Sequence, residues 1–217
     1  VEKENIQKEN IEAIKNGLHN LYKHIDNIKN KFGLNVIVAL NKYYTDTKEE
    51  IDFLTQKLKE KQIEISIVEG WEKGGEGAID IANKIVELAN KNSNLNYMYE
   101  LEDDIKTKIL KVSTKIYGAK NVIYSKEAEE QIEKINLFGY SNLPICIAKT
   151  QYSFSDDPKN LECKNDYSIN VKSVELKAGA GFIVVIAGNI MTMPGLPKMP
   201  AAENIDIDKD GNIIGLF

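Results

Sequence analysis

Two apolar runs on either side of an amphipathic helix pattern constrain the fold of this chain more than any other feature. The runs are residues 34–40 and 63–68, both rich in β-branched side chains, and the helix pattern begins near Thr47. Strands that are buried on both faces have such near-continuous apolar sequences, so the stretch predicts a β-α-β unit with two parallel strands. The crossover in such a unit is right-handed, and ligands bind outside the carboxyl ends of its strands.

An aromatic side chain follows each predicted strand by about three positions. Tyr43 follows the first run and Trp71 follows the second. Parallel strands bring both loops to the same edge of the sheet, and neighbouring strands lie roughly 4.8 Å apart. The two rings could therefore face each other across a gap that a flat heterocycle would fill. Trp71 lies among Glu, Lys and Gly residues, which favours an exposed or ligand-facing ring over a core position.

The loop around Trp71 is rich in glycine. Residues 69–77 read Glu-Gly-Trp-Glu-Lys-Gly-Gly-Glu-Gly, and a helix pattern follows over 76–90. Helix N-termini bind anions, so the loop could hold a phosphate group. No Lys-Ser or Lys-Thr pair follows the glycines, as a Walker motif requires, and a tight turn is the favoured role of the glycines considered alone. The side chains of the helix pattern that are expected to face inward are Ile79, Ala82, Ile85, Val86 and Ala89.

Composition argues against several classes of function. The net charge of −5 does not suit general binding to nucleic acids or anionic membranes. No apolar run approaches the roughly 20 residues that span a bilayer, and the polar N-terminal helix does not resemble a secretory signal. Cys146 and Cys163 lack metal-ligand spacing, and idle thiols in a reducing cytosol are favoured over a disulfide. His19 and His24 share one predicted helix, so we expect no metal site or histidine-based triad.

A polar segment without periodicity, residues 92–96, is the predicted domain boundary. Residues 1–95 would form an α/β domain that opens with a helix over 11–32, and residues 96–217 an α+β domain with segregated helices and strands. The elements expected in the second domain are helices over 101–116 and 127–137, strands over 122–124, 143–148, 169–176 and 182–187, an irregular proline-rich segment over 192–200, and a hairpin around Asp210 and Gly211. The acidic hairpin mimics the start of a calcium-binding loop, but no glutamate occupies the twelfth position.

Five long motifs resemble the sequences of formate–tetrahydrofolate ligases. They are residues 41–47, 69–77, 143–158, 178–181 and 188–197, and the resemblance extends from about Leu18 to the last residue. Members of that family are much longer, so the resemblance implies that this chain is their C-terminal part. The family's ATP-binding P-loop and the basic residues that hold formyl phosphate would lie in the missing N-terminal part. This chain has no arginine and no glycine-rich Lys-Ser or Lys-Thr sequence.

The resemblance implies a reaction in which ATP is used to join formate to the N10 nitrogen of tetrahydrofolate, through formyl phosphate. It also implies that residues 1–95 belong to a P-loop NTPase-like parallel-sheet domain that binds nucleotide and folate. Tyr43 and Trp71 match the pair that sandwiches the pterin ring, although the family more often has Phe at the first position. Other loop residues that the resemblance offers as substrate contacts are Asn41, Asp46, Glu69, Lys73, Gly74, Gly75, Glu76 and Gly77.

The resemblance further implies Mg²⁺ with ATP, bound mainly by the missing N-terminal part, and stimulation by a monovalent cation. It implies a cytoplasmic homo-oligomer, often a tetramer. The expected partners are tetrahydrofolate, formate, ATP and the missing N-terminal part, without nucleic acid or membrane. An alternative from another class stays open, namely a non-catalytic module that binds a planar ligand or stabilises an oligomer.

Overall fold

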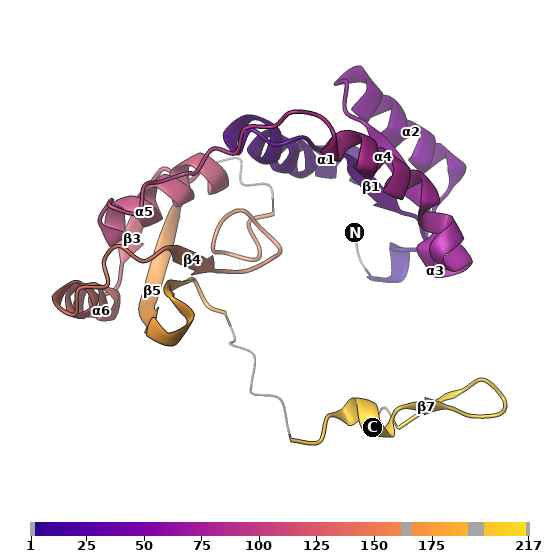
Figure 1. Cartoon of the computed structure of the whole chain (residues 1–217). Helices are drawn as coiled ribbons and strands as arrows, with labels where there is room; N and C mark the ends of the chain where they lie inside the picture. The colour runs from indigo at the N-terminus through magenta and orange to yellow at the C-terminus, as the bar shows by residue number, and fades with distance from the viewer. Residues whose placement is uncertain (1–2, 162–165, 191–197, 216–217) are drawn as a thin grey trace.

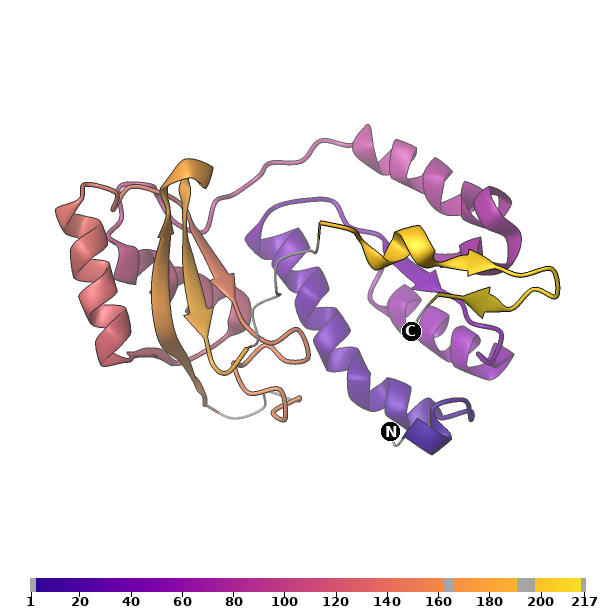
Figure 2. The ribbon, with the colours of Figure 1, turned by 90° about the horizontal axis from the view of Figure 1, so that it is seen from below.

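Three small β-sheets lie within residues 3–161, 166–190 and 198–215, which the computed structural model describes (Figure 1). In both views of the ribbon, α1 (Ile11–Asp26) lies between the first sheet and the second (Figures 1 and 2). Hydrogen bonds tie this region to both sides. The Tyr22 hydroxyl donates to the Lys57 carbonyl at 3.5 Å, and the side-chain NH₂ of Asn27 donates to the Ile116 carbonyl at 3.0 Å. The first helix and the residue after it therefore contact α2 (Lys48–Glu60) on one side and Ile116 on the other.

The predicted β-α-β unit is present. β1 (Val38–Asn41) leads into α2 (Lys48–Glu60), which returns to β2 (Ile65–Val68). The two strands pair in parallel, with the first residue of one opposite the first residue of the other. Their carboxyl ends therefore lie side by side at one edge of the sheet.

The strands of this unit are not buried on both faces, which corrects the prediction from their apolar sequences. Ala39 of β1 and Ile67 of β2 are exposed. A third helix, α4 (Ile79–Ala89), packs on β2. Its side chains that were predicted to face inward are all exposed: Ile79, Ala82, Ile85, Val86 and Ala89. Two strands roughly 4.8 Å apart make a sheet only about as wide as one helix, so the described residues cover just part of each apolar face.

The starts of α1 and α2 share one acidic side chain. Thr47 is the N-cap of α2: its hydroxyl accepts from the Glu50 amide, and the Glu50 carboxylate accepts from the Thr47 amide at 3.1 Å. These reciprocal bonds form a capping box, which the sequence Thr47-Lys-Glu-Glu50 favours. The other Glu50 oxygen accepts from the amide of Asn10, the N-cap of α1, at 2.7 Å. Glu50 thus fixes the two helices to each other.

Thr47→Ala is expected to lower the free energy of unfolding by about 1 kcal/mol, since it removes a helix N-cap.

The pKa of Glu50 lies below its usual value, chiefly because the Asn10 amide donates to the carboxylate. Glu50 therefore stabilises the fold above the pKa that it has in the unfolded chain, and this contribution is lost as pH falls through the lower folded-state pKa. Urea unfolding of wild type and Glu50→Gln should accordingly differ near neutral pH, and the difference should shrink as pH falls below the pKa that Glu50 has in the unfolded chain. Glu49→Gln is the matched control, and an equal effect there would contradict the capping role.

The second sheet has four strands in the order β3-β5-β6-β4. Pairs β3/β5 and β4/β6 are parallel, whereas β5/β6 is antiparallel. The elements are α5 (Ile105–Val112), β3 (Asn121–Tyr124), α6 (Lys126–Leu137), β4 (Ile145–Ala148), β5 (Ser168–Lys177) and β6 (Phe182–Ala187). Helices and strands alternate along the chain as far as β4, so the expected segregation of helices from strands is wrong. The reason is that β3 and β4, which are separated by a helix, pair with the later strands β5 and β6 rather than with each other. The core side chains buried between helices and sheet include Ile109, Ile132, Ile169, Ile183 and Val185.

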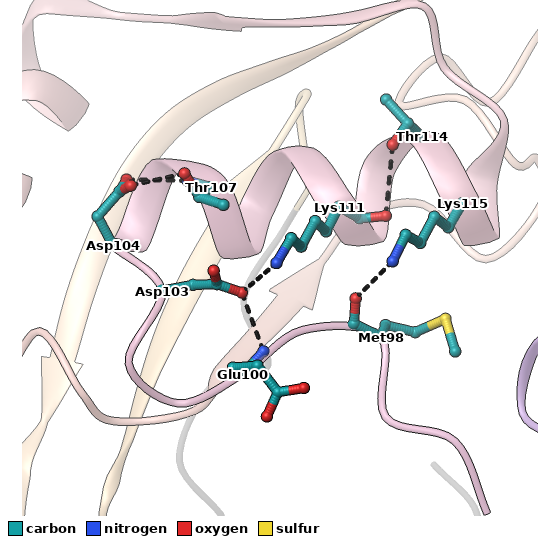
Figure 3. Close-up of polar contacts among 8 residues, drawn as sticks. All are labelled: Met98, Glu100, Asp103, Asp104, Thr107, Lys111, Thr114 and Lys115. Atoms are coloured by element: carbon teal, nitrogen blue, oxygen red, sulfur yellow. Dashed lines mark hydrogen bonds and ion pairs between the residues drawn. The ribbon is translucent and has the colours of Figure 1, made fainter.

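Residues 90–104, which include the predicted domain boundary, contain no helix or strand. Side chains of α5 and the turn after it hold this segment in place (Figure 3). The Lys111 ammonium pairs with Asp103 at 2.5 Å, and the Lys115 ammonium donates to the Met98 carbonyl at 3.1 Å. Asp104 caps α5, so the helix begins four residues later than the predicted Leu101. The position of a domain boundary within 92–96 stays a prediction.

The C-terminal hairpin forms as predicted, from β7 (Asp206–Ile207) and β8 (Ile213–Ile214). Asp208 accepts hydrogen bonds from the Asp210 and Asn212 amides at 2.9 and 2.8 Å. The acidic side chain therefore shapes the turn, in agreement with the hairpin interpretation. Most of the proline-rich segment expected over 192–200 lies outside the described residues, and so does Cys163. Cys146, on β4, is an exposed free thiol.

Candidate functional site

The loops that follow β1 and β2 lie next to each other, as the parallel arrangement predicts. Asn41, the last residue of β1, is opposite Val68, the last residue of β2. One residue further on, the Lys42 amide donates to the Val68 carbonyl at 2.9 Å. Because the strands are direct neighbours, the two loops begin roughly 4.8 Å apart.

Three large rings project from these loops, and all are exposed. The exposed fractions are 59% for Tyr43, 74% for Tyr44 and 78% for Trp71. The exposure of Trp71 agrees with its polar sequence neighbours. The ring beside Trp71 belongs to Tyr44, with the centroids 6.3 Å apart and the planes tilted by 32°. The sequence predicted Tyr43 as the ring that pairs with Trp71 across a ligand, and that pairing stays a prediction.

A turn after β1 decides how the two tyrosines are presented. The Asp46 carboxylate accepts from the Tyr43 amide at 2.8 Å, and the Asp46 amide donates back to the Tyr43 carbonyl at 3.1 Å. Aspartate favours such turns because its short side chain bonds to nearby backbone. Asp46 therefore acts on the site by fixing the backbone. Asn41 lies exposed at the start of this loop.

The glycine-rich segment folds back onto its own beginning. It contains the one-turn helix α3 (Gly70–Lys73) and a 3₁₀ turn (Gly74–Ala78), and α4 starts only at Ile79, later than the predicted helix. The Glu69 amide donates to the Gly77 carbonyl at 3.0 Å. A Cβ on Gly77 would lie 2.4 Å from the Glu69 carbonyl oxygen. The close approach of backbone to backbone explains why glycine occupies position 77.

The other glycines of this segment differ in whether the backbone requires glycine at their positions. Gly74 has a φ of +59°, a conformation that side chains disfavour. Gly75 has open space around its Cα and a φ outside that range. Gly75 and Glu76 are both exposed at the tip of the segment. The four predicted positions 74–77 are therefore brought together, but only Gly74 and Gly77 are constrained by the backbone.

One carboxylate joins the two loops electrostatically. The Glu69 oxygens lie 2.7 Å from the Lys42 ammonium and 2.5 Å from the Lys73 ammonium. These partners, Lys42 first, lower the pKa of Glu69 to about 2. The same contact raises the pKa of Lys42. Lys42 was not among the predicted site residues, because a lysine at a strand end is ordinary in a lysine-rich chain.

A second polar contact anchors α4 beneath this edge. The hydroxyl of buried Ser66 donates to the Asp80 carboxylate at 2.5 Å, and Lys84 lies 3.0 Å from the same oxygen. Lys84 also donates to the Ile65 carbonyl at 2.9 Å. These bonds hold α4, the helix that follows the glycine-rich turn, on β2. They therefore fix the C-terminal end of the segment that carries Trp71.

A cavity with a volume of about 850 Å³ lies elsewhere in the chain. The residues that line it include Leu95, residues 97–102, Phe32, Val112 and Ile116. None of the predicted site residues lines this cavity. The described residues contain no group of three or more His, Cys, Asp or Glu side chains suited to a metal ion. Within the same ranges, no helix is both long enough and apolar enough to cross a membrane.

Comparison with known proteins gives one consistent result. The whole chain, residues 1–217, matches the family model described as formate–tetrahydrofolate ligase. Formate–tetrahydrofolate ligases of Staphylococcus aureus strains JH9, JH1 and Mu3 are each 45% identical to it over 217 residues. The alignments cover 100% of this chain and 39% of each relative, so the chain spans about two fifths of the length of these relatives. Because the match includes both aromatic loops and every element described above, the chain belongs to the formate–tetrahydrofolate ligase family.

Proposed function

We propose that this chain forms the folate-binding part of a ligase that joins formate to the N10 nitrogen of tetrahydrofolate. Formate would attack the γ-phosphate of ATP to give formyl phosphate and ADP, and N10 would then attack the formyl carbon and displace phosphate. Family membership supports this reaction. The observation that carries the folate assignment is the exposure of Tyr43, Tyr44 and Trp71 on loops that start from adjacent parallel strands.

A flat pterin needs room between the rings that hold it. Ring planes in contact lie roughly 3.5 Å apart, so two rings that enclose a third are separated by about 7 Å. Tyr44 and Trp71, at 6.3 Å and tilted, are too close for this. We infer that the pterin displaces the Tyr44 ring and stacks on Trp71, with Tyr43 covering its other face. The place suits a ligand, because parallel sheets bind ligands at the carboxyl ends of their strands.

ATP and Mg²⁺ are assigned to another part of the complete ligase. This chain has no glycine-rich Lys-Ser or Lys-Thr sequence that would cradle a phosphate. Lys42 and Lys73 are paired with Glu69, which leaves these two ammonium groups poorly placed to clamp a triphosphate. The relatives are longer than this chain, which covers 39% of them, so residues outside it would hold the nucleotide. Mg²⁺ supplies charge neutralisation during phosphoryl transfer.

The exposed apolar side of the first unit supports contact with that other part. Ile79, Ile85 and Val86 of α4 are at least half exposed, and Ile67 of β2 is 40% exposed. Parallel sheets occur almost only with both faces covered. We infer that the remaining part of the ligase packs on this surface and thereby brings formyl phosphate to the folate loops.

The chain alone is expected to form no formyltetrahydrofolate and to hydrolyse no ATP, since it lacks a phosphate-binding loop. Steady-state assays with the purified 217-residue chain check this. Addition of the separately prepared remaining part should restore turnover if the two parts dock. Turnover by the chain alone would contradict the proposal that ATP binds outside this chain.

Folate binding can be tested independently of turnover. Trp71 is the only tryptophan in the chain, so its emission reports directly on the proposed stacking surface. We expect quenching on titration with tetrahydrofolate. Constant Trp71 emission at saturating tetrahydrofolate in the active, reassembled ligase would contradict the stacking role of Trp71. If the emission instead responds to unrelated planar ligands, and the reassembled ligase shows no turnover, the non-catalytic alternative would be favoured.

A further inference from the structure

Glu69 occupies the point where the segments of the aromatic site meet. Its carboxylate lies between the ammonium groups of Lys42 and Lys73, at 2.7 and 2.5 Å. Lys42 belongs to the loop after β1 and directly precedes Tyr43. Lys73 belongs to α3, the short helix that carries Trp71. A single side chain is therefore bonded to both loops that carry the rings.

The backbone of Glu69 is equally restrained. Its amide donates to the Gly77 carbonyl at 3.0 Å, and its carbonyl lies so close to Gly77 that a Cβ there would approach to 2.4 Å. Glu69 also directly follows β2, whose last residue, Val68, accepts from the Lys42 amide. The Glu69 carboxylate thus extends from a backbone that is fixed at the edge of the sheet. The edge of the sheet therefore sets where the two loops are held by this carboxylate.

We propose that Glu69 is a positioning residue that sets the spacing between the tyrosine loop and Trp71, and so the width of the gap that receives the pterin. The proposal rests on the proposed function for its ligand, but not for its geometry. Two aromatic rings on separate loops need a fixed separation to hold a third ring, and the exposed rings themselves supply little packing that would fix it.

The two ion pairs of Glu69 make unequal contributions to this role. The pair with Lys73 joins the last residue of α3 to Glu69, the N-cap residue of the same short helix, so it acts within one loop only. The pair with Lys42 joins residues 27 positions apart and links one loop to the other. Lys42 and Glu69 side chains are only 31% and 23% exposed, so water screens their pair less than it screens an open surface pair.

Three variants that each remove one ammonium group separate these contributions. Lys42→Met breaks the link between loops, Lys73→Met breaks the local pair, and Lys48→Met breaks the exposed Lys48–Asp52 pair on α2 as a charge-matched control. Methionine keeps an unbranched apolar stem, so the loss is mainly the charge and its hydrogen bonds. Thermal unfolding should show that all three variants fold.

The first measurement uses the ligand-free chain. Nuclear Overhauser contacts between the Tyr44 and Trp71 rings should be present in wild type and Lys48→Met, weaker in Lys73→Met, and lost in Lys42→Met. The pKa of Glu69, followed by carboxyl-carbon shifts, should rise from about 2 toward its usual range in Lys42→Met. Asp46 and Glu72, the other charged groups that face Lys42, remain in every variant.

The second measurement uses the complete ligase. Lys42→Met should raise the KM for tetrahydrofolate by roughly fivefold with a smaller change in kcat, as expected when a positioning contact is lost. Lys73→Met should have a smaller effect, and Lys48→Met none. Glu69→Gln combined with Lys42→Met should be no worse than Glu69→Gln alone, because Glu69→Gln already removes the charge that Lys42 pairs with.

The two measurements distinguish the two proposals. Unchanged ring contacts in Lys42→Met would overturn the positioning role of Glu69, whatever the enzyme kinetics show. Lost ring contacts with a wild-type KM for tetrahydrofolate would leave the positioning role intact and would instead overturn the placement of the pterin between these loops.

Discussion

Trp71→Ala in the complete ligase is expected to raise the KM for tetrahydrofolate tenfold or more while the KM for ATP stays nearly constant. A stacked aromatic contact contributes about 0.5–1.5 kcal/mol beyond the burial of apolar area, and the lost burial adds to this. Each 1.4 kcal/mol corresponds to about a factor of ten in binding. The selectivity for one substrate follows because the nucleotide would bind outside this chain. Steady-state kinetics with each substrate varied in turn measure both constants.

The two tyrosines provide the controls. Tyr43→Ala should raise the same KM, whereas Tyr43→Phe should be almost silent because the ring does the stacking. Tyr43→Ala and Trp71→Ala should be non-additive, since the second change acts on a pterin that is already loose. Tyr44→Ala should leave the KM unchanged or lower it, because the Tyr44 ring lies 6.3 Å from Trp71 in the ligand-free chain and must move aside. A large increase in KM for Tyr44→Ala with none for Tyr43→Ala would exchange the roles of the two residues.

Gly77→Ala is expected to damage both the site and the fold. The new Cβ would lie 2.4 Å from the Glu69 carbonyl oxygen and 2.5 Å from its carbon, which are backbone atoms that cannot rotate away. Overpacking of this kind costs roughly 1–3 kcal/mol. The shift would act directly on Glu69 and therefore on the Trp71 helix. We expect a melting temperature lower by several degrees and a KM for tetrahydrofolate raised at least as much as by Lys42→Met.

Gly75→Ala is the matched control for this change. It lies two residues earlier in the same turn, and an added Cβ would meet open space. Its melting temperature and KM should stay close to those of wild type. Equal damage from Gly75→Ala and Gly77→Ala would mean that the turn needs flexible residues in general, and would contradict the backbone contact as the cause.

Local sequence patterns were sufficient for much of this fold. The parallel β-α-β unit followed from two apolar runs around a helix, and the capping box of Thr47 and Glu50 from residues only three apart. The C-terminal hairpin followed from Asp210 and Gly211. In each case the decisive interactions lie within a few residues along the chain or repeat with a fixed period. Long motifs likewise indicated the family, which the match to the family model over residues 1–217 shows.

The three-dimensional arrangement of the chain decided the rest. The sequence pattern of α4 marks an apolar face but cannot say what covers it, and the two-stranded sheet proved too narrow to bury Ile79 and Val86. Adjacent tyrosines look equivalent in sequence, yet the turn around Asp46 places the ring of Tyr44, and not that of Tyr43, beside Trp71. Family membership and the β-α-β unit were thus determined by the sequence itself. The exposed face of the first unit and the geometry of the rings were decided only by the tertiary structure, because they depend on which surfaces and loops the folded chain brings within contact distance.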